Sequence, residues 1–176
     1  MCEFFSCVIT QKKVVWDDGS MSHKKLLAKA GITDNTLVNR KHVSVEILPK
    51  VAGRYTRDKK DLTLKCDEEA TLPPWFVENR KKHEARAWAE FDKAKEKCLA
   101  IGTEKKETSG FMFAADNSAV TARNNSIVTA WDNSTVNLFH AKSVSASGNA
   151  IVIVEREGSE KCVKLSENAK MVLRWK

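Results

Sequence analysis

The stretch from Asp116 to Glu155 reads DNSAVTAR, NNSIVTAW, DNSTVNLF, HAKSVSAS and GNAIVIVE when it is divided into groups of eight residues. One position of every group holds a valine: Val120, Val128, Val136, Val144 and Val152. So strict a period over five groups indicates an octapeptide repeat, and few folds require one.

The residue two places after each valine is also apolar, and positions i and i+2 of a strand face the same side. We therefore expect the valines to point inward together with Ala122, Ala130, Leu138, Ala146 and Val154. The residues between them are predicted to point outward: Thr121, Thr129, Asn137 and Ser145. Groups that open with Asp-Asn-Ser or Asn-Asn-Ser supply turns. Short strands alternating with turns predict a parallel β-solenoid, and an antiparallel meander is the alternative.

The period slips by three residues at 156–158, which we interpret as a loop, and resumes afterwards. Met112 and Ala114 fit a degenerate first group, and the bulky Phe111 and Phe113 are predicted to cap the open end of the stack. With two or three groups per coil, the array makes about three or four coils.

The chain before the array predicts a small α+β head domain of ββαββα order. The expected elements are a hairpin over residues 2–16, a short helix over 23–30, strands over 42–48 and 61–66, and a long helix from Pro73 to about Ile101. Residues 103–110 form a predicted polar linker. The fold class is thus α+β, with a head domain over residues 1–103 and the solenoid over residues 108–176.

Composition narrows the class of protein. The chain has 176 residues, a net charge of +7 and five cysteines, and it contains no C-x-x-C pair. These features argue against a disulfide framework and a zinc site, and they favour a reducing cytoplasm. No apolar run is long enough to span a membrane, and the N-terminus does not read as a secretory signal.

Several motifs occur together in this chain: CEFFSCVI at the N-terminus, Ser22-His23, VSVEILP over residues 43–49, LTLKCD leading to Pro74-Trp75-Phe76, and the octapeptide tail. In these motifs the chain resembles an uncharacterised family found among phage, prophage and mobile-element proteins. Members usually carry Asp before the Ser-His pair, where this chain has Met21. The resemblance implies an accessory protein acting in the cytoplasm of a bacterial host, and it implies no activity.

Candidate sites are few. No glycine-rich phosphate loop or nucleophile elbow is present, and no histidine pair has the spacing of a zinc motif, so we expect no cofactor and no metal. A polar cluster in the head could gather an acid–base site. Its members are Ser22, His23, Glu46 and Asp67. The competing interpretation makes Ser22 a helix N-cap and His23 a supporting side chain.

Two binding surfaces are predicted as well. Outward aromatic residues could meet a protein partner, and the candidates are Trp131, Phe139 and Trp175. Basic residues of the head could neutralise phosphates if they cluster. They are Lys12, Lys13, Lys24, Lys25, Lys59, Lys60, Lys81 and Lys82; Arg57 could join them.

These features favour binding over catalysis. We expect a non-enzymatic viral or mobile-element accessory protein that modulates a host protein, with counter-defence as one such role. The terminal solenoid coil is predicted to form a homodimer. The alternatives are a nucleic-acid-binding accessory factor that uses the head, and an enzyme of unrecognised type.

Overall fold

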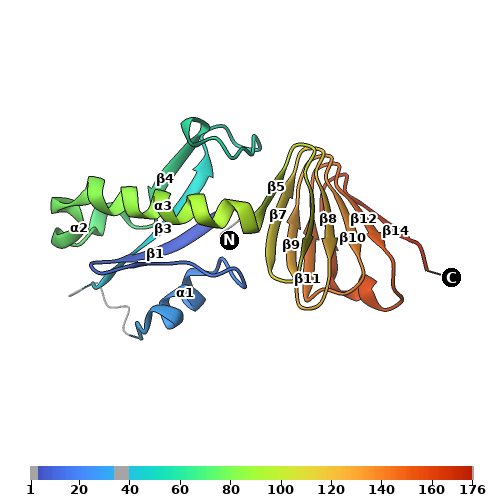
Figure 1. Cartoon of the computed structure of the whole chain (residues 1–176), viewed down its shortest axis with the longest axis horizontal. Coiled ribbons are helices and arrows are strands. Elements are labelled where there is room, and N and C mark those ends of the chain that lie inside the picture. Colours follow the sequence, from blue (N-terminus) through green and yellow to red (C-terminus); the bar gives the residue numbers. More distant parts are fainter. Residues whose placement is uncertain (1–3, 34–39, 176) are drawn as a thin grey trace. The chain divides into compact units, whose positions relative to one another are not determined.

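The computed structural model describes residues 4–33 and 40–175, and it divides the chain into two compact units, Met1–Glu96 and Lys97–Lys176 (Figure 1). The first unit is an α+β structure and the second is a β-solenoid. The division lies several residues before the predicted linker at 103–110. Residues of that linker instead form a strand of the solenoid, β6 (Lys105–Thr108).

An antiparallel sheet of order β2-β1-β3-β4 forms the centre of the first unit. The predicted hairpin is present, because β1 pairs with β2 around a turn in which the Thr10 amide donates to the Lys13 carbonyl. Its strands are β1 (Phe5–Thr10), β2 (Val14–Val15), β3 (His42–Pro49) and β4 (Leu62–Cys66). Two short 3₁₀ helices flank β4, η1 (Lys59–Asp61) and η2 (Glu69–Thr71).

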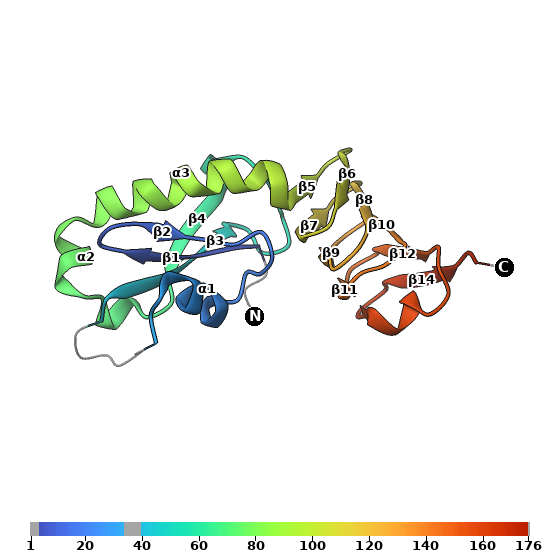
Figure 2. The ribbon, with the colours of Figure 1, turned by 60° about the horizontal axis from the view of Figure 1, so that its bottom comes forward.

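Helices cover both faces of this sheet. Figure 2 shows α3 (Arg80–Cys98) along one face and α1 (His23–Ala30) against the other. On the α3 face the rings of Phe5 and Phe91 lie 5.3 Å apart in an edge-on arrangement. Because side chains alternate along a strand, Ser6 and Val8 of β1 face α1.

The long helix expected from Pro73 to Ile101 is wrong in two places. It is interrupted at Asn79, which separates α2 (Pro74–Glu78) from α3 and accepts the first hydrogen bond of α3 from the His83 amide. It also ends at Cys98, because residues Leu99–Ile101 form β5 and pair with β7. Pairing with a distant strand thus overrides the local preference for helix.

The second unit is a parallel β-solenoid whose ten strands form two five-stranded sheets, in orders β14-β12-β10-β8-β6 and β13-β11-β9-β7-β5. Each strand pairs with the strand two places later, so one coil holds two strands and the stack has about five turns. Its remaining strands are β7 (Phe111–Ala115), β8 (Ala119–Ala122), β9 (Ile127–Ala130), β10 (Thr135–Leu138), β11 (Ser143–Ala146), β12 (Ile151–Val154), β13 (Val163–Leu165) and β14 (Lys170–Leu173).

The solenoid interior is apolar, as the repeat predicted. Val120 pairs with Val136, and Val136 pairs with Val152, so one valine ladder runs through one sheet. Val128 and Val144 form part of a second ladder in the other sheet. All five valines and their i+2 partners are buried in one cluster, and the residues between them are only partly buried.

The two ends of the array are only partly as predicted. Met112 and Ala114 do belong to the interior cluster, but Phe111 and Phe113 do not cap an open end, because β5 and β6 precede them in the stack. The slip after Glu155 is a loop followed by a third 3₁₀ helix, η3 (Ser159–Cys162). Beyond it, Val163 pairs with Val144 and Met171 pairs with Val152, so the ladders resume.

Candidate functional site

The predicted polar cluster assembles on the α1 face of the sheet. His23 is the first residue of α1, and its Nδ1 lies 2.8 Å from Oδ2 of Asp67, just after β4. Its Nε2 lies 3.3 Å from the backbone carbonyl oxygen of Val45 in β3. Both ring nitrogens therefore face acceptors of the protein itself, an arrangement that presents neither of them to a substrate as a general base.

Glu46 completes this cluster. One ligand atom of each of His23, Glu46 and Asp67 lies within 4.8 Å of the other two. The sheet explains the proximity: the Asp67 amide donates to the Ser44 carbonyl, so Asp67 extends the β3–β4 pairing next to Glu46. His23 and Glu46 are half-buried, and the Asp67 side chain is 37% exposed.

Ser22 has a smaller role than expected. It occupies the N-cap position of α1, yet its side chain makes no capping hydrogen bond and is exposed. Its backbone carbonyl instead accepts hydrogen bonds from the amides of Lys25 and Leu26, and its own amide donates to the Ser20 hydroxyl.

A second histidine, His42, lies on the same face of the sheet. It is 1% exposed, and neither of its ring nitrogens has a hydrogen-bond partner among the described residues. Burial, and next the charge of Arg40, lower its pKa below the usual histidine value. His42 is therefore held as a neutral imidazole in the core.

Cys7 and Cys66, two of the three buried cysteines among the described residues, are also unreactive. Burial is the main cause that raises the pKa of the Cys66 thiol to about 11, and it also raises the pKa of Cys7. A thiol rather than a thiolate is the weaker nucleophile, so neither side chain is suited to covalent chemistry.

A groove of about 1160 Å³ also opens on the first unit. Lys12 and Lys13 of the β1–β2 turn line it, together with Arg40, Lys41 and the ring of Trp75. Trp75 is held in place because its indole Nε1 donates to the Arg40 carbonyl at 3.0 Å. Of the basic candidates predicted from the sequence, only Lys12 and Lys13 line this groove, although Arg40-Lys41 and Pro74-Trp75 offered the same basic and aromatic signal.

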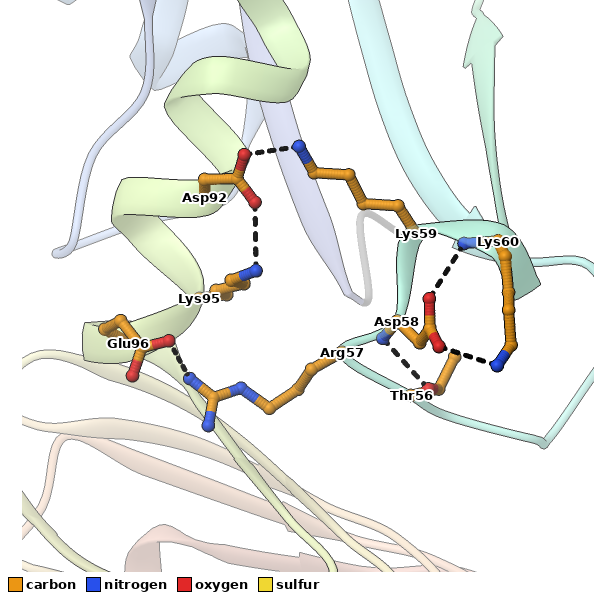
Figure 3. A network of polar contacts seen from close by, with 8 residues as sticks. All are labelled: Thr56, Arg57, Asp58, Lys59, Lys60, Asp92, Lys95 and Glu96. Atoms are coloured by element: carbon orange, nitrogen blue, oxygen red, sulfur yellow. Dashed lines mark hydrogen bonds and ion pairs between the residues drawn. The ribbon is translucent and has the colours of Figure 1, made fainter.

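The other basic candidates lie elsewhere. Lys59 pairs with Asp92 of α3 and Lys60 pairs with Asp58, within a network that also joins Arg57 to Glu96 (Figure 3). The pairs of Arg57 and Lys59 tie the segment between β3 and β4 to α3, and Lys59 and Lys60 each have a carboxylate partner. Four further lysines are exposed on two helices, Lys24 and Lys25 on α1 and Lys81 and Lys82 on α3.

The aromatic candidates of the solenoid do not form one patch. Trp131 follows β9 and Phe139 follows β10, so they lie in successive turns at opposite edges of the stack. Phe139 packs against a turn residue of the preceding coil at the same edge, since the Arg123 guanidinium lies 4.4 Å from the centre of its ring. Trp131 and Phe139 therefore do not share one surface.

The last coil is the most exposed apolar part of the solenoid. Leu165, Met171 and Leu173 occupy positions that point inward in earlier coils, yet they are 42%, 38% and 54% exposed. Trp175 is half-buried and packs against the interior cluster. It thus covers only part of this end.

Two further findings concern the helices of the chain and its similarity to known proteins. Across residues 4–33 and 40–175, no helix combines the length and apolar character needed to cross a bilayer. Comparisons of the chain with protein-family models, with curated proteins and with solved structures give no match.

Proposed function

We propose that this protein is a non-enzymatic accessory protein of a phage or mobile element that binds and modulates a bacterial host protein in the cytoplasm. Counter-defence is one such role. The solenoid is the interaction surface, and it also serves self-association. The phage context rests on the resemblance of the sequence motifs.

The exposed last coil is the observation that carries this proposal. β13 and β14 are the outermost strands of the two sheets, so one edge of each has no neighbour among the described strands. Unpaired strand edges bind other strands, and exposed apolar patches mark protein contacts. Here both features coincide around Met171 and Leu173.

The terminal coils of two copies would meet at this surface as a homodimer. A two-fold axis across the stack would set β14 against a strand of the second copy in antiparallel order and would bury the apolar side chains of both. A host protein with an exposed strand edge would compete for the same surface.

The test uses two matched substitutions. Leu173→Glu places a charge in the exposed end, whereas Ile151→Glu places one at a residue of comparable exposure, 39%, on β12, which is paired on both sides. We expect light scattering to give a dimer for the unchanged protein and for Ile151→Glu, and a monomer for Leu173→Glu.

The same pair of variants tests host binding. A host protein captured by the unchanged chain and by Ile151→Glu should be lost with Leu173→Glu. A monomeric unchanged protein, together with capture that survives Leu173→Glu, would refute the proposed surface.

We also infer that the octapeptide is the repeat unit of the solenoid. Supporting this, β8 to β12 begin at Ala119, Ile127, Thr135, Ser143 and Ile151, eight residues apart. Each coil then contains two octapeptides.

Nucleic-acid binding is the second candidate function, and the groove beside Trp75 favours it. Its exposed lysines could neutralise phosphates, and its indole ring could stack on an unpaired base. If so, the affinity for a single-stranded oligonucleotide should fall steeply with salt, and Trp75→Ala with Lys12→Glu should weaken it. Lys60→Glu is the control, because Lys60 is already paired with Asp58.

A further inference from the structure

We propose that His23, Glu46 and Asp67 bind a divalent transition-metal ion through one imidazole nitrogen and two carboxylates. This inference concerns the first unit alone and does not depend on the proposed interaction surface of the solenoid. No metal site was expected from the sequence, because the three ligands come from α1, β3 and the residue after β4 and share no short spacing.

The orientation of the His23 ring is the first step. Histidines that bind metals usually donate their other ring N–H to a carboxylate or a backbone carbonyl, which fixes the tautomer and the ring plane. Nε2 of His23 has such a partner in the Val45 carbonyl, 3.3 Å away. With that proton placed on Nε2, the lone pair of Nδ1 points toward Asp67.

The contact between Nδ1 and Asp67 is the second step. In that tautomer two acceptors, the Nδ1 lone pair and a carboxylate oxygen of Asp67, face each other at 2.8 Å, a contact that is unfavourable unless a proton or a cation lies between them. A proton on Nδ1 satisfies this distance. A metal ion satisfies the same need once the two atoms part by a few tenths of an ångström, because metal–nitrogen and metal–oxygen bonds are about 2.0–2.2 Å long.

Glu46 supplies the third ligand and a second negative charge. Within the described part of the chain its carboxylate has no hydrogen-bond or ion-pair partner, although it is half-buried. The Lys65 residue opposite it on β4 is exposed, so its ammonium reaches water. A cation held between Glu46 and Asp67 would stabilise both carboxylates.

Ser6 gives an independent indication of a missing polar partner. Ser6 is fully buried and pairs with Glu46 across β1 and β3, so the two side chains lie on the same face of the sheet. Its hydroxyl has no hydrogen-bond partner among the described residues. A water bound to the metal ion could donate to this hydroxyl, which would satisfy a group that is otherwise costly to bury.

The ligand set selects the kind of metal. One imidazole and two carboxylates suit Zn²⁺ or Mn²⁺ better than Ca²⁺ or Mg²⁺, which prefer oxygen alone, or Cu⁺, which prefers sulfur. The exposed side of Asp67 leaves a path for the ion from water.

Calorimetric titration of the whole chain with Zn²⁺ and with Mn²⁺ tests the proposal. We expect one ion per chain for at least one of these metals. The variants Asp67→Asn and Glu46→Gln keep the shape of the side chains and should each weaken binding at least tenfold, and His23→Ala should do the same. His140→Ala is the control, because this exposed histidine lies in the solenoid.

Thermal unfolding separates binding from loss of fold. The bound metal should raise the unfolding temperature of the unchanged protein, since it binds only the folded state, and this rise should vanish in Asp67→Asn. Each variant should still unfold cooperatively without metal. Absence of binding to the unchanged protein, or equal affinity in Asp67→Asn and Glu46→Gln, would overturn the proposal.

Discussion

At the scale of single residues, neighbouring positions along each repeat strand of the solenoid alternate between the interior and the surface. Val136 is fully buried in the middle of a ladder, whereas Thr129, on an adjacent strand of the chain, points outward between Phe113 and Ser145. The repeat predicted this difference because alternation along a strand depends only on local sequence.

Val136→Asp should therefore be severely destabilising, by roughly 4 kcal/mol or more, because it buries a charge without a partner. Thr129→Asp should change the free energy of unfolding by about 0.5 kcal/mol or less. Urea denaturation of the two variants measures the contrast. Equal effects would contradict the assignment of the two faces.

His42 provides a residue-scale prediction about pH. Its folded pKa is lowered, first by burial, so the unfolded chain takes up a proton near pH 6.5 while the folded protein does not. The stability it contributes is present above pH 6.5 and is lost as the pH falls toward the lowered folded value. The free energy of unfolding should thus decrease between about pH 7.5 and 5.5.

His42→Leu should flatten this dependence, as measured by urea denaturation at a series of pH values. The slope that remains belongs in part to His83, whose pKa is lowered by burial and by the charge of Arg86. An equally steep slope in His42→Leu would show that another group carries the effect.

At the scale of elements, the turns of the solenoid stack as closely as its strands do. Gly148 has a φ of +65°, and a Cβ atom added there would lie 2.9 Å from the backbone nitrogen of Asp132 in the coil before it. Gly158, in the loop before η3, has a φ of +83° and open space around the same position.

Gly148→Ala should consequently destabilise the protein more than Gly158→Ala. Both substitutions force an L-residue into a left-handed conformation, which costs about 1–2 kcal/mol. Only Gly148→Ala also forces two neighbouring coils apart. Midpoints of denaturant unfolding give the comparison, and a larger loss at Gly158 would contradict the close approach of the coils.

Elements that depend on local pattern could be predicted from the sequence. The helix at His23–Ala30 was expected over the same residues, and the strands of the array follow from their period. Residues 99–108 were misjudged, because Leu99–Ile101 and Lys105–Thr108 become strands only by pairing with β7 and β8. That pairing is tertiary, and the composition of the segment does not reveal it.

At the scale of the whole molecule, the two units should differ in their resistance to proteases. Arg54 lies exposed in the loop between β3 and η1, where its amide makes only a turn hydrogen bond to Val51. Arg57 and Lys59 in the same segment are tied to α3 (Figure 3). In the solenoid, the amides of Arg123 and Lys142 donate to the preceding coil.

Trypsin should accordingly cut after Arg54 before it cuts after Arg123 or Lys142, because cleavage requires local unfolding of the backbone. Mass spectrometry of the fragments at short times identifies the order. The substitution Glu96→Lys should speed cleavage after Arg57, because it removes the ion pair between Arg57 and Glu96 of α3. Early cleavage after Arg123 would argue against a stable stack.

The sites were less predictable than the fold at this scale. From the sequence, the only reason to group His23, Glu46 and Asp67 is that they lie at the ends of neighbouring elements. The distances between them, and the contact of His23 with Val45, depend on how β3 and β4 align. The placement of Trp131 and Phe139 at opposite edges could not be predicted, because the number of strands per coil decides which turns share an edge. The repeat alone leaves that number open.

The pairing of strands sixteen residues apart, such as Val120 with Val136, has a consequence for how this chain can change during evolution. Removing eight residues would move every later strand into the opposite sheet and would transfer each later turn to the other edge. Removing sixteen would delete a complete coil and return every later residue to its former sheet. Where paired strands are sixteen residues apart, related chains of different length should therefore differ by multiples of sixteen residues, whereas the loop before η3 shows that a turn accepts extra residues.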